Sequence, residues 1–126
     1  MAKKKIMIVD DDKVFLEELQ ELLDNAGYEV IGTEGRAPVA EIANSAKPDL
    51  ILLDLRMPEK SGFEVATELK QFNETADIPI IAMTGFYTTE ERSFLMNFCG
   101  IKKCLKKPLS PLDVIKEIEW AMEEGR

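Results

Sequence analysis

The chain has 126 residues, of which 45% are hydrophobic and 32% charged, and its formal net charge at pH 7 is −8. This length and composition are typical of a globular protein, so we expect one domain over residues 1–126. The acidic balance disfavours direct binding of nucleic acid, and the lack of histidine excludes histidine as metal ligand, general base or phosphoryl carrier.

A basic segment at residues 1–5 resembles the start of a signal peptide. The apolar run behind it covers only residues 6–9 before three aspartates, which is too short for the apolar region of such a signal. No other apolar stretch approaches the length of a membrane span. We therefore expect a cytoplasmic protein with no membrane insertion.

Short apolar runs alternate with amphipathic stretches along the chain. Strands are predicted at residues 6–9, 28–33, 50–53 and 78–84, of which the first and third are buried, and pairing in the last should start after Pro79. An edge strand is predicted at 101–107. Helices are predicted at residues 13–26, 37–46, 62–72, 88–98 and 111–124. In the first helix, the stripe Phe15, Leu19, Leu22 and Ala26 should face the core. The alternation predicts an α/β fold with a parallel sheet covered by helices on both faces.

Polar residues stand at the ends of four of these predicted strands. In chain order they are Asp10, Asp11 and Asp12, then Asp54, then Thr84, and finally Lys106 and Lys107. Ligands of open α/β sheets bind beyond the carboxyl ends of the strands. We therefore expect these side chains to meet in one site, although Asp12 also fits the N-cap of the first helix.

Three adjacent aspartates at a strand end repel one another, by roughly 1 kcal/mol per pair at about 4 Å in water. A hard divalent cation would remove this repulsion. Carboxylate, carbonyl and water oxygens suit Mg²⁺, which takes only one or two carboxylates from the protein and leaves room for a phosphate. A lysine could neutralise a phosphoryl group, and Thr84 could donate a hydrogen bond to it.

Four segments carry a family resemblance, namely "IVDDD", "LLDLRMPEKSG", "IAMTG" and "KKPL". They resemble the CheY-like receiver domains of two-component response regulators, and the resemblance extends over the whole chain. It implies a stand-alone single domain with a flavodoxin-like fold. That fold is a doubly wound, five-stranded parallel sheet with strand order 2-1-3-4-5.

The resemblance also assigns the roles of the site residues. Asp54 would accept a phosphoryl group from a phosphohistidine on a partner protein. Asp10, Asp11, Asp54 and the backbone carbonyl of Arg56 would hold Mg²⁺, with Asp11 as a direct ligand. Thr84 and Lys107 would contact the phosphoryl group; Lys107 is preferred over Lys106 because it directly precedes a proline.

A protein of this kind is a switch and not a turnover enzyme. The phosphodonor would be a histidine kinase or a histidine phosphotransfer protein, and the signal would leave through contacts with a downstream protein target. Val14 lies off the core stripe of the first helix and close to Asp11. We expect it to contact the phosphodonor.

The sequence departs from the family pattern at Cys104, where most members have Tyr or Phe. Strand alternation places Cys104 opposite Leu105, on the outer, partner-binding side between the fifth strand and its neighbouring helices. Neighbouring lysines should favour its thiolate if the sulfur is exposed. Cys99 should be buried and inert. Without an aromatic ring at 104, the signal would travel through residues 84–90, where Phe86 and Tyr87 are the available aromatics.

Two other functional classes fit part of the pattern. Asp10 and Asp12 resemble the first motif of haloacid dehalogenase-type phosphatases, in which they would be nucleophile and general acid, but a downstream acidic metal pair is missing. A receiver-like assembly module without phosphorylation is a further alternative. A flavin-binding protein is less well supported, because no phosphate-binding loop rich in Ser, Thr and Gly follows the first strand.

Overall fold

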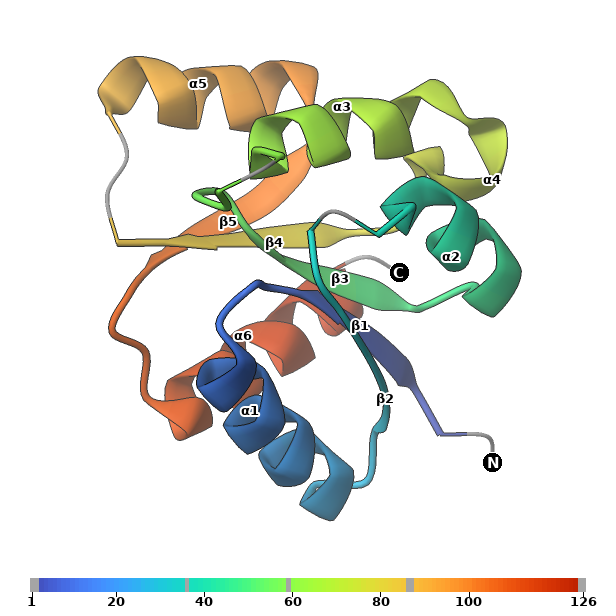
Figure 1. Ribbon diagram of the computed structural model, residues 1–126, viewed down its shortest axis with the longest axis vertical. Coiled ribbons are helices and arrows are strands. Elements are labelled where there is room, and N and C mark those ends of the chain that lie inside the picture. Colours follow the sequence, from blue (N-terminus) through green and yellow to red (C-terminus); the bar gives the residue numbers. More distant parts are fainter. Residues whose placement is uncertain (1–2, 36, 59, 86–87, 125–126) are drawn as a thin grey trace.

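The computed structural model describes residues 3–35, 37–58, 60–85 and 88–124. Five parallel strands form one sheet in the order β2-β1-β3-β4-β5 (Figure 1). The strands are β1 (Lys5–Val9), β2 (Glu29–Thr33), β3 (Leu50–Asp54), β4 (Ile80–Thr84) and β5 (Ile101–Lys106). The predicted flavodoxin-like architecture and its strand order are confirmed.

The helices cover both faces of this sheet. One face carries α1 (Lys13–Asn25) and α6 (Pro111–Glu124), whereas the other carries α2 (Val39–Ala46), α3 (Gly62–Gln71), α4 (Asn73–Ala76) and α5 (Thr89–Phe98) (Figure 1). The short α4 was not predicted. Extended backbone at Phe72 ends α3, and the Thr75 hydroxyl then stabilises the turn by donating to the Leu69 carbonyl at 2.6 Å.

The sheet separates two hydrophobic cores, because successive strand residues point to opposite faces. Met7, Val9, Ile51 and Leu53 pack in the core beneath α2–α5. Their immediate neighbours in β1 and β3 pack in the core beneath α1 and α6. Burial on both faces explains why these strands read as continuous apolar runs.

The core stripe predicted for α1 is partly wrong. Leu19 is buried as expected, but the next buried residue is Leu23, whereas Leu22 is only partly buried and Ala26 is exposed. The chain leaves the helix at Ala26 and turns at Gly27, whose φ is +97°, toward β2. The core-facing stripe therefore follows an i, i+4 row and ends one turn earlier.

The start of β4 and the edge position of β5 agree with the sequence-based predictions. Pairing in β4 begins at Ile80, after Pro79, as predicted. β5 is an edge strand, and Lys102 and Lys106 on it are exposed. Within the described ranges, no helix has the length and apolar character needed to cross a membrane.

Candidate functional site

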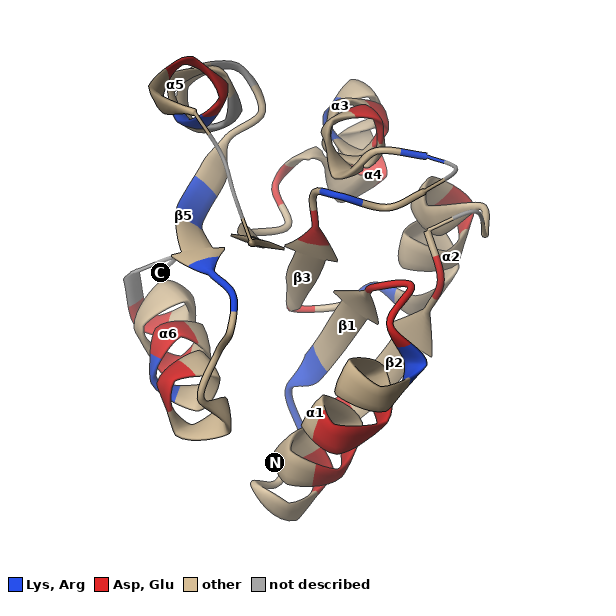
Figure 2. Ribbon diagram, turned by 60° about the vertical axis from the view of Figure 1, so that its left-hand side comes forward, with Lys and Arg blue, Asp and Glu red and all other residues tan. Residues whose placement is uncertain are grey.

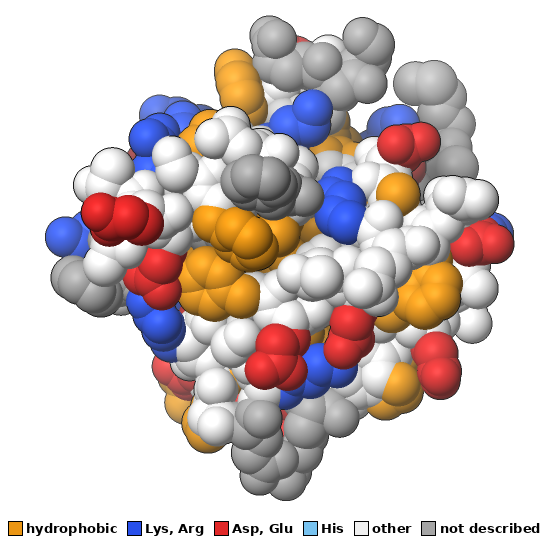
Figure 3. Space-filling view, turned by 90° about the horizontal axis from the view of Figure 1, so that it is seen from above, with side chains coloured by type: hydrophobic (Ala, Val, Ile, Leu, Met, Phe, Trp, Pro, Cys, Tyr) orange, Lys and Arg blue, Asp and Glu red, His pale blue; other side chains and the backbone are white. Residues whose placement is uncertain are grey.

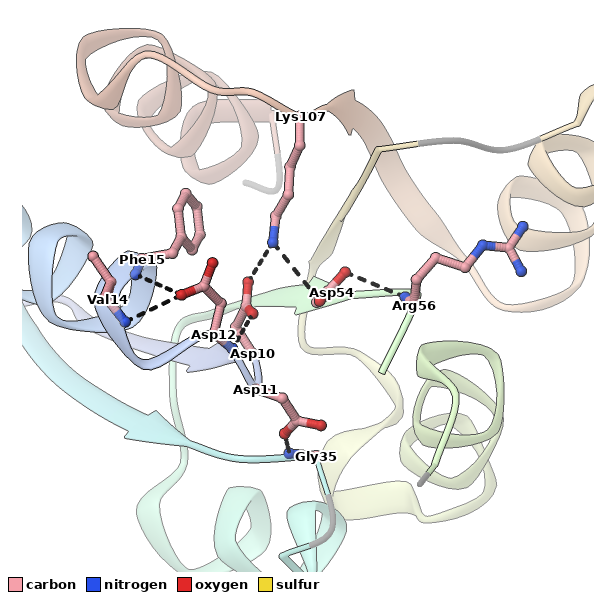
Figure 4. A network of polar contacts seen from close by, with 9 residues as sticks. All are labelled: Asp10, Asp11, Asp12, Val14, Phe15, Gly35, Asp54, Arg56 and Lys107. Carbon is pink, nitrogen blue, oxygen red and sulfur yellow. Dashed lines mark hydrogen bonds and ion pairs between the residues drawn. The ribbon is translucent and has the colours of Figure 1, made fainter. Parts of the chain in front are cut away.

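Charged residues gather at the carboxyl edge of the sheet. Figure 2 shows acidic residues at the ends of β1 and β3 and basic residues at the end of β5. The central strand β3 pairs with β1 on one side and β4 on the other, so residues far apart in the sequence meet at this edge. The close-up in Figure 4 shows Asp10, Asp54 and Lys107 pointing toward one another.

Asp10 is a completely buried carboxylate at the end of β1. Its Oδ2 accepts a charge-assisted hydrogen bond from Lys107 Nζ at 2.7 Å, and its Oδ1 accepts the backbone N–H of Asp12 at 2.9 Å. A buried charge is stable only when it is paired and hydrogen-bonded. The lysine and the β1–α1 loop satisfy that requirement.

Asp54 ends β3 and is 7% exposed. Its Oδ1 accepts the backbone N–H of Arg56 at 3.2 Å, and its Oδ2 lies 3.7 Å from Lys107 Nζ. Burial and the nearby charge of Asp10 raise the pKa of Asp54, while Lys107 and the Arg56 N–H act in the opposite direction. The site therefore carries more negative charge than Lys107 alone neutralises.

Neighbouring residues position both the backbone and the side chain of Lys107. Its N–H donates to the Thr84 carbonyl at 2.8 Å, and the Lys107–Pro108 peptide bond is cis. Its Nζ lies 4.4 Å from the centroid of the Phe15 ring, a cation–π contact that the sequence did not indicate. Lys106, the other candidate, is exposed.

The three consecutive aspartates face three different ways. Asp12 caps α1, because its Oδ1 accepts the N–H groups of Val14 and Phe15 at 3.1 and 3.2 Å. Asp11 turns away from Asp54 and accepts the N–H of Gly35 at 2.7 Å (Figure 4). Of the three, only Asp10 forms an ion pair with Lys107 in the part of the chain that is described.

Thr84 is buried at the carboxyl end of β4. It directly follows Met83, which pairs with Asp54, and it pairs with Lys106 in β5. The strand register thus places Thr84 between the strand ends that carry Asp54 and Lys107, as the sequence predicted.

Gly62, at the start of α3, allows that helix to approach the end of β3 closely. A Cβ atom at this position would lie 2.3 Å from the Asp54 carbonyl oxygen and 2.6 Å from the Leu55 Cα. Its N–H donates to the Leu55 carbonyl at 3.0 Å. No side chain fits here, so steric crowding explains why the "PEKSG" segment has glycine at this position.

The donor chemistry of the site fits Mg²⁺ only in part. Among the described residues, no group of three Asp, Glu or Cys side chains is assembled for a metal ion. Asp10 and Asp54 do converge, and their repulsion is what a cation would relieve. Two carboxylates are enough for Mg²⁺, which keeps several of its waters.

Cys104 occupies the face of β5 opposite Leu105, as predicted, since each packs against a different core. The Cys104 sulfur is partly buried and not exposed, so the condition for a thiolate favoured by lysines is not met. Cys104 packs against the core beneath α2–α5, and burial raises the pKa of its thiol despite the charge of Arg92. Lys103, expected to favour the thiolate, instead pairs with Glu117 of α6 at 2.8 Å.

Cys99 is buried, as expected, and its Sγ lies 4.0 Å from the Thr67 hydroxyl. Phe86 and Tyr87, which we expected to transmit a signal, lie outside the described residues. Neither the contact of Phe15 with Lys107 nor that of Asp11 with Gly35 could be inferred from spacing, because each joins separate elements.

A parallel α/β sheet with two carboxylates and a lysine at its carboxyl edge is the arrangement that the receiver-domain resemblance of the sequence implies. The response regulator receiver domain model matches residues 6–119. The polar-differentiation response regulator DivK of Brucella anthropi is 34% identical over 116 residues, which cover 92% of this chain and 94% of that protein. The chain therefore belongs to the response regulator receiver domain family, which places it among two-component signalling proteins.

Solved structures support the same assignment. The CheY-like receiver domain protein from Methanospirillum hungatei JF-1 matches with a TM-score of 0.86 and 26% identity, over 98% of this chain and 97% of that one. The Vibrio cholerae chemotaxis protein CheY4 matches with a TM-score of 0.87 and 27% identity, over 95% and 99% of the two chains.

Proposed function

We propose that this protein accepts a phosphoryl group on Asp54 from a phosphohistidine of a histidine kinase or histidine phosphotransfer protein. The observation that supports this function most directly is the convergence of Asp10, Asp54 and Lys107 at one sheet edge. Family membership supports the same chemistry. The product is a phosphorylated switch that acts through contacts with a downstream protein.

In this reaction a carboxylate oxygen of Asp54 attacks phosphorus, and the bond from phosphorus to the donor imidazole nitrogen breaks. Lys107 is near enough to neutralise charge that develops on the phosphoryl oxygens, and the Thr84 hydroxyl would donate a hydrogen bond to one of them. Bound Mg²⁺, held by Asp10, Asp11, Asp54 and the Arg56 carbonyl, would supply further charge neutralisation. Asp11 would have to leave Gly35 to serve as a ligand.

The proposal is tested with acetyl phosphate and Mg²⁺, followed by mass spectrometry of the adduct. One acid-stable, base-labile phosphoryl group on Asp54 is expected, and Asp54→Asn should abolish it. The same experiment without Mg²⁺ should give little or no adduct, because the repulsion around Asp54 then stays uncompensated.

Two other outcomes would contradict the proposal. An adduct that survives in Asp54→Asn but disappears in Asp10→Asn would favour the phosphatase reaction. Asp12, its expected general acid, is already engaged as the N-cap of α1. A protein that takes up no phosphoryl group from any donor would favour an assembly module.

Val14 gives this experiment a second arm. Val14 is 65% exposed, at the start of α1 near the site, which suits a contact with the phosphodonor protein. Val14→Asp should slow transfer from a cognate donor protein but leave uptake from acetyl phosphate unchanged. Equal loss with both donors would mean that the substitution damages the site itself.

A further inference from the structure

Arg56 connects two parts of the molecule that lie far apart in the sequence. Its backbone N–H donates to Oδ1 of Asp54 at 3.2 Å, so it belongs to the loop that holds this carboxylate. Its side chain points away from Asp54 (Figure 4), and its Nη2 lies 2.7 and 2.8 Å from the two carboxylate oxygens of Glu91 in α5. One residue thus contacts both Asp54 and the first turn of α5.

Glu91 also completes the N-terminal cap of α5. Its Oε1 accepts the N–H of Thr88 at 2.9 Å, and the Thr88 hydroxyl accepts the N–H of Glu91 at 3.1 Å. This reciprocal pair is a capping box, which stabilises the start of a helix. The Thr88 N–H and the Arg56 guanidinium both lower the pKa of Glu91, so the group that holds the cap is a carboxylate.

The Arg56 guanidinium also bridges two helices. It lies 5.6 Å from the centroid of the Phe63 ring in α3, within cation–π range, and it pairs with Glu91 in α5. Figure 3 looks onto this side of the molecule, where charged groups border hydrophobic side chains. α5 itself packs mainly against β5. Its first turn is held by the capping box and by the ion pair with Arg56.

We propose that Glu91 is a positioning residue that acts through Arg56 and couples the loop around Asp54 to the first turn of α5. A phosphoryl group on Asp54 changes the acceptor of the Arg56 N–H, and the Arg56 guanidinium transmits that change to the capping box. This route requires no ring at position 104, where the chain has a half-buried thiol. The ligand-dependent part of the inference rests on the proposed function, whereas the coupling of the two segments does not.

Coupling between two sites is reciprocal, and this gives a test in the free protein. Glu91→Gln keeps an amide oxygen for the Thr88 cap but removes the charge that binds Arg56. Arg56→Gln removes the other partner. Glu68→Gln is the matched control. This substitution breaks the 2.7 Å ion pair between Glu68 and Lys60, which is of the same kind and joins the same loop to α3.

Hydrogen exchange of single amides, followed by NMR, measures the coupling. Glu91→Gln should speed exchange of the Arg56 amide about two- to five-fold, and Arg56→Gln should do the same to the Glu91 amide, as expected for a half-exposed ion pair. Glu68→Gln should leave both rates unchanged. An unchanged Arg56 amide in Glu91→Gln would overturn the proposal, because a purely local cap would not affect that amide.

Beryllofluoride with Mg²⁺, a mimic of the phosphoryl group, tests the ligand-dependent part of the inference. Binding is monitored by fluorine NMR, and exchange of the Glu91 and Arg92 amides is compared before and after. The wild type and Glu68→Gln should show a change that Glu91→Gln loses while still binding the mimic. An equal response in all three proteins would overturn the coupling. A wild type that binds no beryllofluoride would contradict the proposed function instead, and the free-protein rates would still decide the coupling.

Discussion

Lys107 and Arg56 stand on two sides of the same carboxylate, yet the protein holds them in different surroundings. The Lys107 side chain is 22% exposed and pairs with a fully buried Asp10, while the Phe15 ring covers its ammonium group. The Arg56 side chain is 47% exposed and pairs with a Glu91 side chain that is 28% exposed. Breaking a buried pair costs about 3–5 kcal/mol, whereas an exposed pair contributes about 0.2–1 kcal/mol. The side that would touch the phosphoryl group is therefore rigid, and the side that reaches α5 is easily rearranged.

The largest effect should separate these two cations directly. Lys107→Met leaves Asp10 buried without its partner and beside Asp54, so we expect the free energy of unfolding to fall by about 3–5 kcal/mol. Arg56→Gln should lower it by less than about 1 kcal/mol. Urea unfolding measures both.

A double variant provides the control for this comparison. Lys107→Met combined with Asp10→Asn removes both charges and should recover part of the lost stability. Equal losses for Lys107→Met and Arg56→Gln would contradict the contrast between a rigid and an adjustable side.

A smaller effect concerns the excess negative charge on the rigid side. The pKa of Asp54 is raised above its usual 3.8, so the folded state holds this proton more tightly than the unfolded state does. Ionised Asp54 therefore lowers stability progressively as pH rises from 3.8 through the folded-state pKa. Asp54→Asn should be more stable than the wild type at pH 7 and lose that advantage below pH 3.8. A less stable Asp54→Asn at pH 7 would show that Lys107 outweighs burial and Asp10.

The smallest effect should be seen at the two thiols. Cys104 is half-buried and Cys99 is fully buried, so a thiol reagent should label Cys104 first. Burial raises the pKa of Cys104, and its labelling rate should still increase above pH 9.0, its ordinary value. If the α5 side is the adjustable one, beryllofluoride should change the Cys104 rate. Faster labelling of Cys99 would contradict this placement.

The sequence predicted the features that depend on where the strands end and on the spacing of apolar residues. Asp10, Asp54, Thr84 and Lys107 could be assigned to one edge because parallel strands deliver their carboxyl ends together. The buried face of α1 was misplaced at Leu22, since an i+3 and an i+4 row are both compatible with helical spacing.

Contacts between separate elements could not be read in this way. The ion pair from Arg56 to Glu91 joins residues 35 positions apart, and spacing gives no indication of it. The sequence contains a signal only for the role of Glu91 at the start of α5, because Thr88 and Glu91 match the Thr-x-x-Glu pattern of a capping box. The surroundings of the Cys104 thiol were misjudged for the same reason, because its sequence neighbour Lys103 pairs with Glu117 of α6.

The lysines along β5 have a consequence for how copies of this chain meet in concentrated solution. An exposed edge strand is a template for sheet-to-sheet aggregation, because its backbone groups can pair with another chain. β5 is the last strand at this edge of the sheet in the described part of the chain, so two molecules that joined through it would bring Lys102 and Lys106 of each copy together. The like-charge repulsion disfavours that contact, so an acidic protein protects an open edge of its sheet with positive charge.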